Sequence, residues 1–175
     1  ATFLRSRDGA NPFECAREMF CGQTVCLNLE TSPEGPWQSD KNVHLSVSEE
    51  HLDTIPDSVR IVSLVNNHVW DSGDPSRLVQ ALEQRKKLVV GPENPSQSRV
   101  TLHGMELDFF SACFNLPRLR LSYRGSRADA LEQMLAQSSA ERKIVNLHWG
   151  YEHTDVPPWF QRELARRLVD AGANI

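Results

Sequence analysis

The amino-acid sequence predicts a layered α/β domain with a mixed β-sheet flanked by helices. Short apolar runs that are typical of buried strands alternate along the chain with amphipathic patterns that are typical of helices. The chain has 175 residues, of which 39% are hydrophobic and 24% charged, an ordinary balance for a globular domain with its own core. We see no internal repeat and no domain boundary, and we therefore expect residues 1–175 to form a single domain.

In the first half of the chain, helix starts are marked by capping residues and strands by apolar runs. Asn11 followed by Pro12 is typical of a helix N-terminus, and this helix would extend to about Phe20. Residues 60–65 form a nearly continuous apolar run, which is typical of a buried strand. We also expect strands at residues 24–30 and 43–48, a loop at residues 31–41, and a short helix that begins at Ser48 and ends before Pro56.

The second half of the chain continues the alternation of helix and strand. His103 and Gly104 separate two β-prone runs within residues 99–114, which predicts a hairpin. Proline or serine marks the other helix starts, and glycine ends the last helix. We expect helices from Asp74-Pro75 to about Lys87, from Ser126, and from Pro157-Pro158 to Gly172, with strands at residues 88–90 and 143–149 and a loop at residues 91–98.

Charge and cysteine usage restrict the possible partners of the chain. The net charge of −4 disfavours binding to a nucleic-acid backbone, and no run of about 18 or more apolar residues predicts a membrane span. The four cysteines include no Cys-x-x-Cys pair, which disfavours a zinc ribbon. We expect Cys15, Cys26 and Cys113 to be buried free thiols; a Cys15–Cys21 disulfide and the localisation of the protein are left open.

Polar clusters follow three of the predicted strands, at the point where each strand ends. The first cluster contains Asn28 and Glu30, the second contains Asn66, Asn67 and His68 with Asp71, and the third contains His148 with Glu152. Because loops at the carboxyl ends of strands converge on one edge of an open α/β sheet, we expect these side chains to form a shared site.

Imidazole, carboxylate and amide groups together suit divalent zinc, manganese or iron. We predict His68 and His148 as metal ligands, with Glu30 as a bridging carboxylate and Asn67 as a weaker ligand. Asp71 would accept the hydrogen of the second ring nitrogen of His68 and fix its tautomer. As catalytic residues we predict His68, Asp71 and Glu152. Asn28 and Asn66 are further candidate site residues. The alternatives are that Asn66 only satisfies backbone groups in a turn, that His68 is an ordinary hydrogen-bonded or exposed residue, and that Glu30 is a solvated strand end.

Three sequence motifs resemble those of the bacterial capsule-synthesis family of the CapA, or poly-γ-glutamate synthesis, type. These are Asn-Leu-Glu-Thr at residues 28–31, Ser-Leu-Val-Asn-Asn-His at residues 63–68 with its following Asp and Gly, and His-Trp-Gly-x-Glu at residues 148–152. A proline, a glutamine and an Asp-Ala-Gly segment follow in the family's order, at Pro158, Gln161 and residues 170–172. The resemblance covers nearly the whole chain.

This resemblance implies a calcineurin-like metallophosphatase fold, a mixed β-sandwich flanked by helices. It places Asn67, His68 and His148 at positions of metal ligands and Glu30 near the acidic bridging position. The family's opening Gly-Asp strand and its closing Gly-His-x-x-His segment have no counterpart here. We therefore expect a domain that is incomplete at both ends, and little or no firmly bound metal in the chain as it stands.

Two functions follow from this interpretation. The first is a metal-dependent hydrolase-like domain in capsule or poly-γ-glutamate biosynthesis, acting on a phosphoester or on an anionic polymer. The second is a non-catalytic accessory component of a membrane-bound polymer synthesis or export complex. An unrelated α/β binding domain is a third, weaker alternative. A basic patch for a polymer would comprise Arg118, Arg120, Arg124 and Arg127, although such a run is also typical of a solvated loop.

Overall fold

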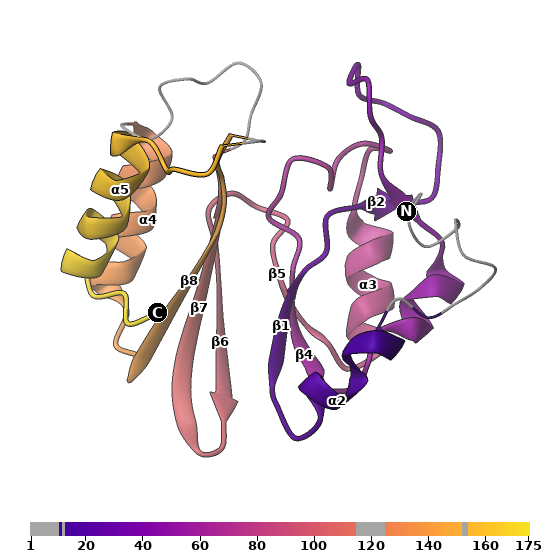
Figure 1. The fold of residues 1–175 in the computed structure, drawn as a ribbon, viewed down its shortest axis with the longest axis horizontal. Helices are drawn as coiled ribbons and strands as arrows, with labels where there is room; N and C mark the ends of the chain where they lie inside the picture. Colours follow the sequence, from indigo (N-terminus) through magenta and orange to yellow (C-terminus); the bar gives the residue numbers. More distant parts are fainter. Residues whose placement is uncertain (1–10, 12, 115–124, 152–153) are drawn as a thin grey trace. The chain divides into compact units, whose positions relative to one another are not determined.

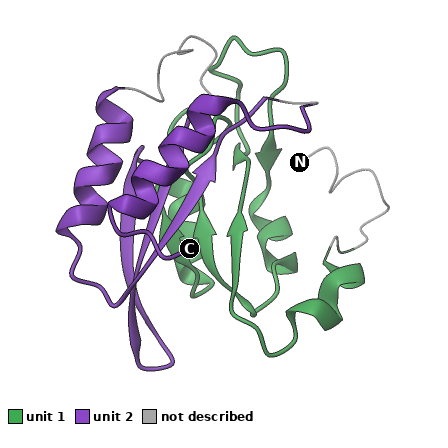
Figure 2. Ribbon diagram, turned by 60° about the vertical axis from the view of Figure 1, so that its left-hand side comes forward, with its two compact units in different colours: residues 1–92 green, residues 93–175 purple. Residues whose placement is uncertain are grey.

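A computed structural model of the chain describes residue 11 and residues 13–114, 125–151 and 154–175 (Figure 1). Helices alternate with strands that form several small sheets, which confirms the predicted α/β class. The chain divides into two compact units, residues 1–92 and 93–175, each with its own sheet (Figure 2). The packing of the two sheets into one sandwich domain stays a prediction.

The first unit is built on a parallel sheet of three strands. These are β1 (Val25–Asn28), β4 (Val59–Ser63) and β5 (Leu88–Val90), with β4 in the middle. Helix α3 (Ser76–Gln84) buries its apolar face, which includes Leu78 and Leu82, against Val62 and Leu64. The parallel order matters for function because it brings the carboxyl ends of β1 and β4 side by side.

The remaining elements of the first unit are shorter than the sequence predicts. The expected helix from Asn11 to Phe20 is a 3-10 turn, η1 (Glu14–Ala16), followed by one turn of α-helix, α2 (Arg17–Phe20). The predicted side-chain cap is absent, since Phe13 is the N-cap residue; Oδ1 of Asn11 instead accepts a hydrogen bond from the backbone N–H of Phe13 at 2.9 Å, in the turn that precedes this segment. The expected short helix before Pro56 is the 3-10 helix η2 (Glu49–Thr54).

The predicted strand at residues 43–48 is wrong in extent. Only β3 (Ser46–Val47) is a strand, and it pairs with the equally short β2 (Ser32–Pro33). The segment has the alternating pattern of a strand, but only two of its residues have a partner strand, because β2 is two residues long. Val43, at the start of the expected strand, is consequently 60% exposed.

The second unit is built on a mixed sheet in which β7 (Met105–Cys113) lies between β6 (Ser96–Leu102) and β8 (Arg142–His148). The predicted hairpin is confirmed: β6 and β7 are antiparallel and joined by His103 and Gly104, both with positive φ. Strand β6 begins at Ser96, so the expected loop at residues 91–98 is shorter than predicted. Strand β8 pairs in parallel with β7.

Helices α4 (Ser126–Gln137) and α5 (Trp159–Asp170) cover one face of this second sheet (Figure 1). Their buried side chains, such as Leu131, Leu135 and Leu164, pack with Phe110 and Phe114 of the second unit. In the part of the chain that the structure describes, no helix has both the length and the apolar character needed to cross a membrane.

The expectation of three buried thiols is correct only for Cys113. Cys15 lies in the short surface segment η1 and is exposed. Cys26, on the edge strand β1, is also exposed. Side chains alternate between the two faces of a strand, and Val25 and Leu27, on the face opposite to that of Cys26, pack against the core. The apolar character of the run does not indicate which face is covered.

Candidate functional site

Two of the three predicted polar clusters meet at the carboxyl edge of the sheet in the first unit. Asn28, the last residue of β1, pairs in register with Ser63, the last residue of β4. Glu30 follows the first of these strands and His68 follows the second. This register brings Nε2 of His68 to 3.7 Å from Oε1 of Glu30.

Asp71 is the central anchor of this edge, and its side chain is completely buried. Its Oδ2 lies 2.6 Å from Nδ1 of His68 and also accepts a hydrogen bond from the backbone N–H of Leu45 at 3.1 Å. An ionised carboxylate can only accept hydrogen bonds, so Nδ1 of His68 carries the hydrogen. In the neutral ring, Nε2 then carries a lone pair that faces Glu30.

The pKa of Asp71 is held below its ordinary value. Burial alone would raise this pKa, but the hydrogen bonds from Lys41, from His68 and from the backbone of Leu45 favour the ionised form and together outweigh burial. Asp71 therefore acts on His68 as a fixed acceptor. Both carboxylate oxygens of Asp71 already accept hydrogen bonds from these partners. Asp71 can therefore position His68, and its predicted catalytic role would act through that ring.

Lys41 is a residue of this site that the sequence analysis did not identify. Its Nζ lies 2.6 Å from Oδ1 of Asp71 and also donates to the backbone carbonyl of Asn67. Thirty residues separate Lys41 from Asp71, so no local pattern links them. The only indication of its role in the sequence is that Lys41 is the single lysine or arginine in residues 30–45.

The two asparagines that precede the histidine have different settings. Asn66 is buried; its Nδ2 donates to the backbone carbonyl of Leu29 at 2.9 Å, and its Oδ1 accepts from the backbone N–H of His68 at 3.0 Å. The same Nδ2 is 3.5 Å from Oδ1 of Asn28. Asn66 thus ties the end of β1 to the turn that carries His68. Asn67, half-buried, is next to His68 in that turn.

The pair of Glu30 and His68 fits two positions of a divalent metal site. Zinc binds imidazole nitrogen and carboxylate oxygen at about 2.0–2.2 Å, so two such bonds readily span the 3.7 Å between Nε2 and Oε1. Two acceptors that face each other also favour a cation between them. Among the described residues, however, no group of three or more histidine, cysteine or acidic side chains is gathered closely enough to hold a metal ion. The fit is therefore that of a partial ligand set.

The third polar cluster belongs to the second unit. His148 ends β8 and pairs in register with Cys113 of β7. The other predicted residues of this half fall largely outside the described part of the chain: Glu152, Arg118, Arg120 and Arg124. Arg127 is described, and its Nη1 donates to the carbonyl of Cys113 at 3.3 Å. Whether His148 joins Glu30 and His68 in one site stays a prediction.

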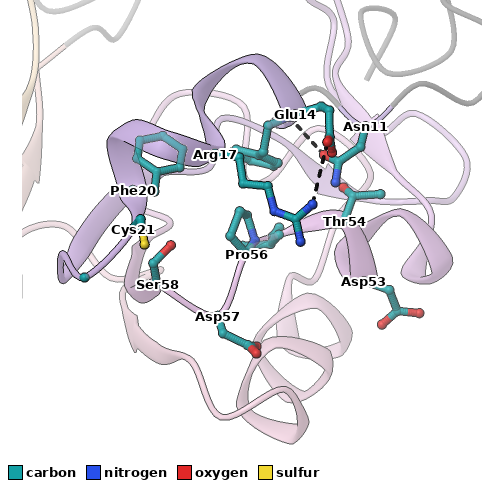
Figure 3. Close-up of a pocket in the computed structure, with 13 residues that line it drawn as sticks. Asn11, Glu14, Arg17, Phe20, Cys21, Asp53, Thr54, Pro56, Asp57 and Ser58 are labelled. Carbon is teal, nitrogen blue, oxygen red and sulfur yellow. Dashed lines mark hydrogen bonds and ion pairs between the residues drawn. The ribbon is translucent and has the colours of Figure 1, made fainter.

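The first unit also has a cavity of about 510 Å³, at the other end of the sheet (Figure 3). Gly22 and Ser58, which line it, precede β1 and β4 respectively, so it lies at the amino ends of these strands. Arg17 and Glu14 form an exposed ion pair of 3.6 Å in it. None of the described residues that line the cavity is a histidine, and the cavity is separate from the candidate site.

The fold and the site define an α/β protein with a carboxylate-held imidazole at a strand edge. Sequence comparison identifies the family: residues 3–175 match the model of the bacterial capsule synthesis protein family PGA_cap, and the chain belongs to this family. The family resemblance that the motifs predicted is thereby confirmed.

Two curated relatives are similar over most of the chain. The Capsule biosynthesis protein CapA of Bacillus anthracis is 27% identical over 159 residues, which cover 79% of this chain and 38% of that protein. The PGA biosynthesis protein CapA of Bacillus subtilis (strain 168) is 24% identical over 156 residues, covering 79% of this chain and 41% of that protein. The chain thus matches about two fifths of the length of each relative.

A solved structure supports the fold. The crystal structure of a hypothetical protein from Thermus thermophilus superposes with a TM-score of 0.50 at 20% identity, covering 83% of this chain and 52% of that one. At this identity the similarity concerns the fold alone.

Proposed function

We propose that this chain is part of a metal-dependent, hydrolase-like protein of bacterial capsule or poly-γ-glutamate biosynthesis. The observation that carries the proposal is the His68 ring, whose Nδ1 contacts the buried Asp71 at 2.6 Å while its Nε2 lies 3.7 Å from Glu30. Metal-binding histidines almost always donate their second ring N–H to an acceptor, and a carboxylate is one of the common acceptors. Membership of the PGA_cap family and the names of the two CapA relatives support the biosynthetic role.

Within the first unit, Glu30, His68 and Asp71 would contribute through the contacts that they already make. Glu30 and His68 would hold a divalent ion of manganese, zinc or iron, and Asn67 and His148 are the further predicted ligands. Asp71 would keep the hydrogen on Nδ1, so that Nε2 is free to bind. A bound divalent ion supplies an acidified water and polarises a phosphoryl or carbonyl oxygen. The proposed substrate is a phosphoester or an amide of an anionic polymer, with Glu152 as a predicted acid–base group.

Calorimetric titration of the chain with Mn²⁺ and with Zn²⁺ tests the ligand pair. We expect weak but saturable binding, because only part of the ligand set is present in the first unit. His68→Ala and Glu30→Gln should each weaken it by at least about tenfold, since each removes one donor atom. His103→Ala is the matched control: this exposed histidine in the hairpin turn should leave the affinity unchanged.

Equal affinity in the wild type and in His68→Ala would overturn the proposed metal site. The hydrolase activity itself is tested separately, with a generic phosphodiester substrate and a longer protein that covers the full length of the CapA relatives. Absence of turnover with every divalent metal would refute the enzymatic part of the proposal.

The accessory role is favoured by a specific observation, and we keep it as a second candidate. The contacts of Asp71 with His68, Lys41 and Leu45 hold a surface loop in place, so these residues have a structural task that needs no metal. If the chain acts only as a component of a membrane-bound synthesis or export complex, His68→Gln should leave capsule formation intact. If the chain acts as a hydrolase, the same substitution should abolish capsule formation.

A further inference from the structure

Asn66 joins the two segments that carry the candidate ligands Glu30 and His68. Its side chain is 5% exposed and makes three polar contacts. Nδ2 donates to the backbone carbonyl of Leu29 at 2.9 Å and lies 3.5 Å from Oδ1 of Asn28, while Oδ1 accepts from the backbone N–H of His68 at 3.0 Å. One amide group therefore contacts both the residue before one candidate ligand and the backbone of the other.

The contact with Leu29 lies where the pairing of the two strands ends. Asn28 and Ser63 are the last paired residues of β1 and β4. The backbone N–H of Leu29 still donates to the carbonyl of Ser63 at 3.0 Å, and the carbonyl of Leu29 then accepts from the side chain of Asn66. The amide of Asn66 thus continues, through a side chain, the connection that the backbones make within the sheet.

The carbonyl that Asn66 holds also belongs to the turn of Glu30. The backbone N–H of Thr31 donates to the same Leu29 carbonyl at 3.0 Å and closes a three-residue turn centred on Glu30. A carbonyl oxygen has two lone pairs and can accept both hydrogen bonds. Because Asn66 fixes this carbonyl, it also fixes the position from which the Glu30 side chain leaves the backbone.

The oxygen of the same amide acts on the turn of His68. The backbone N–H of Asn66 donates to the carbonyl of Leu64 at 3.0 Å, so Asn66 is itself held just after β4, and its Oδ1 holds the backbone of His68. Asp71 fixes the ring of His68 separately, through Nδ1. The two supports therefore differ: Asn66 sets where the residue stands, and Asp71 sets how its ring is turned.

We propose that Asn66 is a positioning residue that sets the 3.7 Å separation between Nε2 of His68 and Oε1 of Glu30. The inference rests on the proposed metal site and deepens it, because it assigns the residue that holds the two ligands at a spacing that a divalent ion can bridge. Ligands held in place lose less conformational freedom when the ion binds. The alternative, in which Asn66 only satisfies backbone groups in its own turn, predicts that the contact with Leu29 is dispensable.

Asn66→Ala and Asn66→Ser separate these two roles. Alanine removes both halves of the amide. The serine hydroxyl can still accept from the backbone N–H of His68 within the turn, but it is too short to reach the carbonyl of Leu29. Calorimetric titration with Zn²⁺ and with Mn²⁺ should therefore show an affinity that is lower by about tenfold or more in both variants. Wild-type affinity in Asn66→Ser would overturn the proposal.

A second measurement needs no metal ion. In NMR spectra of the metal-free chain, the backbone N–H of His68 reports on its turn, and the ring resonances of His68 report on its surroundings. Hydrogen exchange of this N–H should be at least about tenfold faster in Asn66→Ala than in Asn66→Ser, which keeps an acceptor for it. The ring resonances should shift in both variants, because the ring moves relative to Glu30. Unchanged ring resonances in both variants would also overturn the proposal.

Lys87→Met is the matched control. Lys87 is also buried in the first unit, but its Nζ donates to the carbonyl of Pro56 at 2.8 Å, near the amino ends of the strands. The variant should lose stability and keep the metal affinity and the His68 resonances of the wild type. An equal loss of affinity in this variant would overturn the proposal, since general destabilisation would then explain the effect of Asn66. If the wild type binds neither ion, the proposed metal site fails, and the His68 resonances alone decide the role of Asn66.

Discussion

Asp71 in the first unit and Asp108 in the second are both completely buried carboxylates that pair with a cation, but their surroundings differ. Asp108 accepts two hydrogen bonds from Arg99, at 2.7 and 2.8 Å, and further ones from Gln97 and Ser138. These partners link β6 and β7 to the end of α4. Asp71 instead accepts from Lys41, from the Leu45 backbone and from an imidazole.

The difference teaches that a buried, ion-paired carboxylate does not by itself identify a functional site. The partners of Asp108 have further contacts, from Arg99 to Glu106 at 3.8 Å and from the backbone N–H of Ala140 to Ser138 at 3.1 Å, and all of these hold elements of the unit together. His68 has a second ring nitrogen, and that nitrogen faces another carboxylate, Glu30, at 3.7 Å. Of these two networks, only that of Asp71 therefore orients a side chain that can bind a ligand.

The largest effect that separates the two networks is expected from Asp71→Asn. Without the negative charge, the buried ends of Lys41 and His68 lose their common acceptor, and the free energy of unfolding should fall by about 3–5 kcal/mol. The affinity for Mn²⁺ or Zn²⁺ should fall by roughly 10- to 100-fold, because the His68 tautomer is no longer fixed. Urea unfolding and calorimetric titration measure the two quantities.

Asp108→Asn is the matched control for this experiment. It should also destabilise the protein, since Arg99 and Ser138 lose a buried acceptor, but it should leave the metal affinity unchanged. If both variants lowered the metal affinity equally, the assignment of Asp71 to the site would be wrong.

The second prediction concerns acid stability. The hydrogen bonds from Arg99 lower the pKa of Asp108 most strongly, and those from Ser138 and Gln97 add to this, while burial opposes them. Because the pKa is lower in the folded chain than in the unfolded chain, the contribution of this carboxylate is complete above about pH 4 and is lost as the pH falls through the folded pKa. Unfolding midpoints measured between about pH 2 and 6 should therefore decline less steeply in Asp108→Asn than in the wild type. A parallel decline in both proteins would contradict this assignment.

The smallest effect is expected from Lys41→Met. Asp71 would keep its hydrogen bonds from His68 and the Leu45 backbone, so the loss of one charged donor should cost about 1–3 kcal/mol in urea unfolding. The half-buried aliphatic stem is retained in methionine, which limits the loss of packing. A loss as large as that of Asp71→Asn would mean that Lys41, and not His68, is the main partner of the carboxylate.

Much of the fold followed from local patterns. The hairpin was predicted from two β-prone runs on either side of His103 and Gly104, and the buried strand at residues 60–65 from a nearly continuous apolar run, which corresponds to β4. The contact of His68 with Asp71 also lies within one turn of the chain, three residues apart, so the sequence could suggest it. In each case the interacting residues are close neighbours.

Other features were not predictable because they depend on residues far apart. The pairing of Lys41 with Asp71 and the approach of Glu30 to His68 require the register between β1 and β4 and the path of the loop before β3. The exposure of Cys26 depends on which face of β1 is covered by the core, and the shortness of β3 on the length of its partner strand.

The sequence by itself thus determined the position of most helices and strands, though not the extent of the short ones, and which polar residues stand at the strand ends, because side-chain periodicity and turn chemistry act over a few residues. The tertiary structure decided which of those residues meet. Strand register and burial are set by the packing of the whole unit. They place Asp71, and not the similarly buried Asp108, beside the histidine of the candidate site.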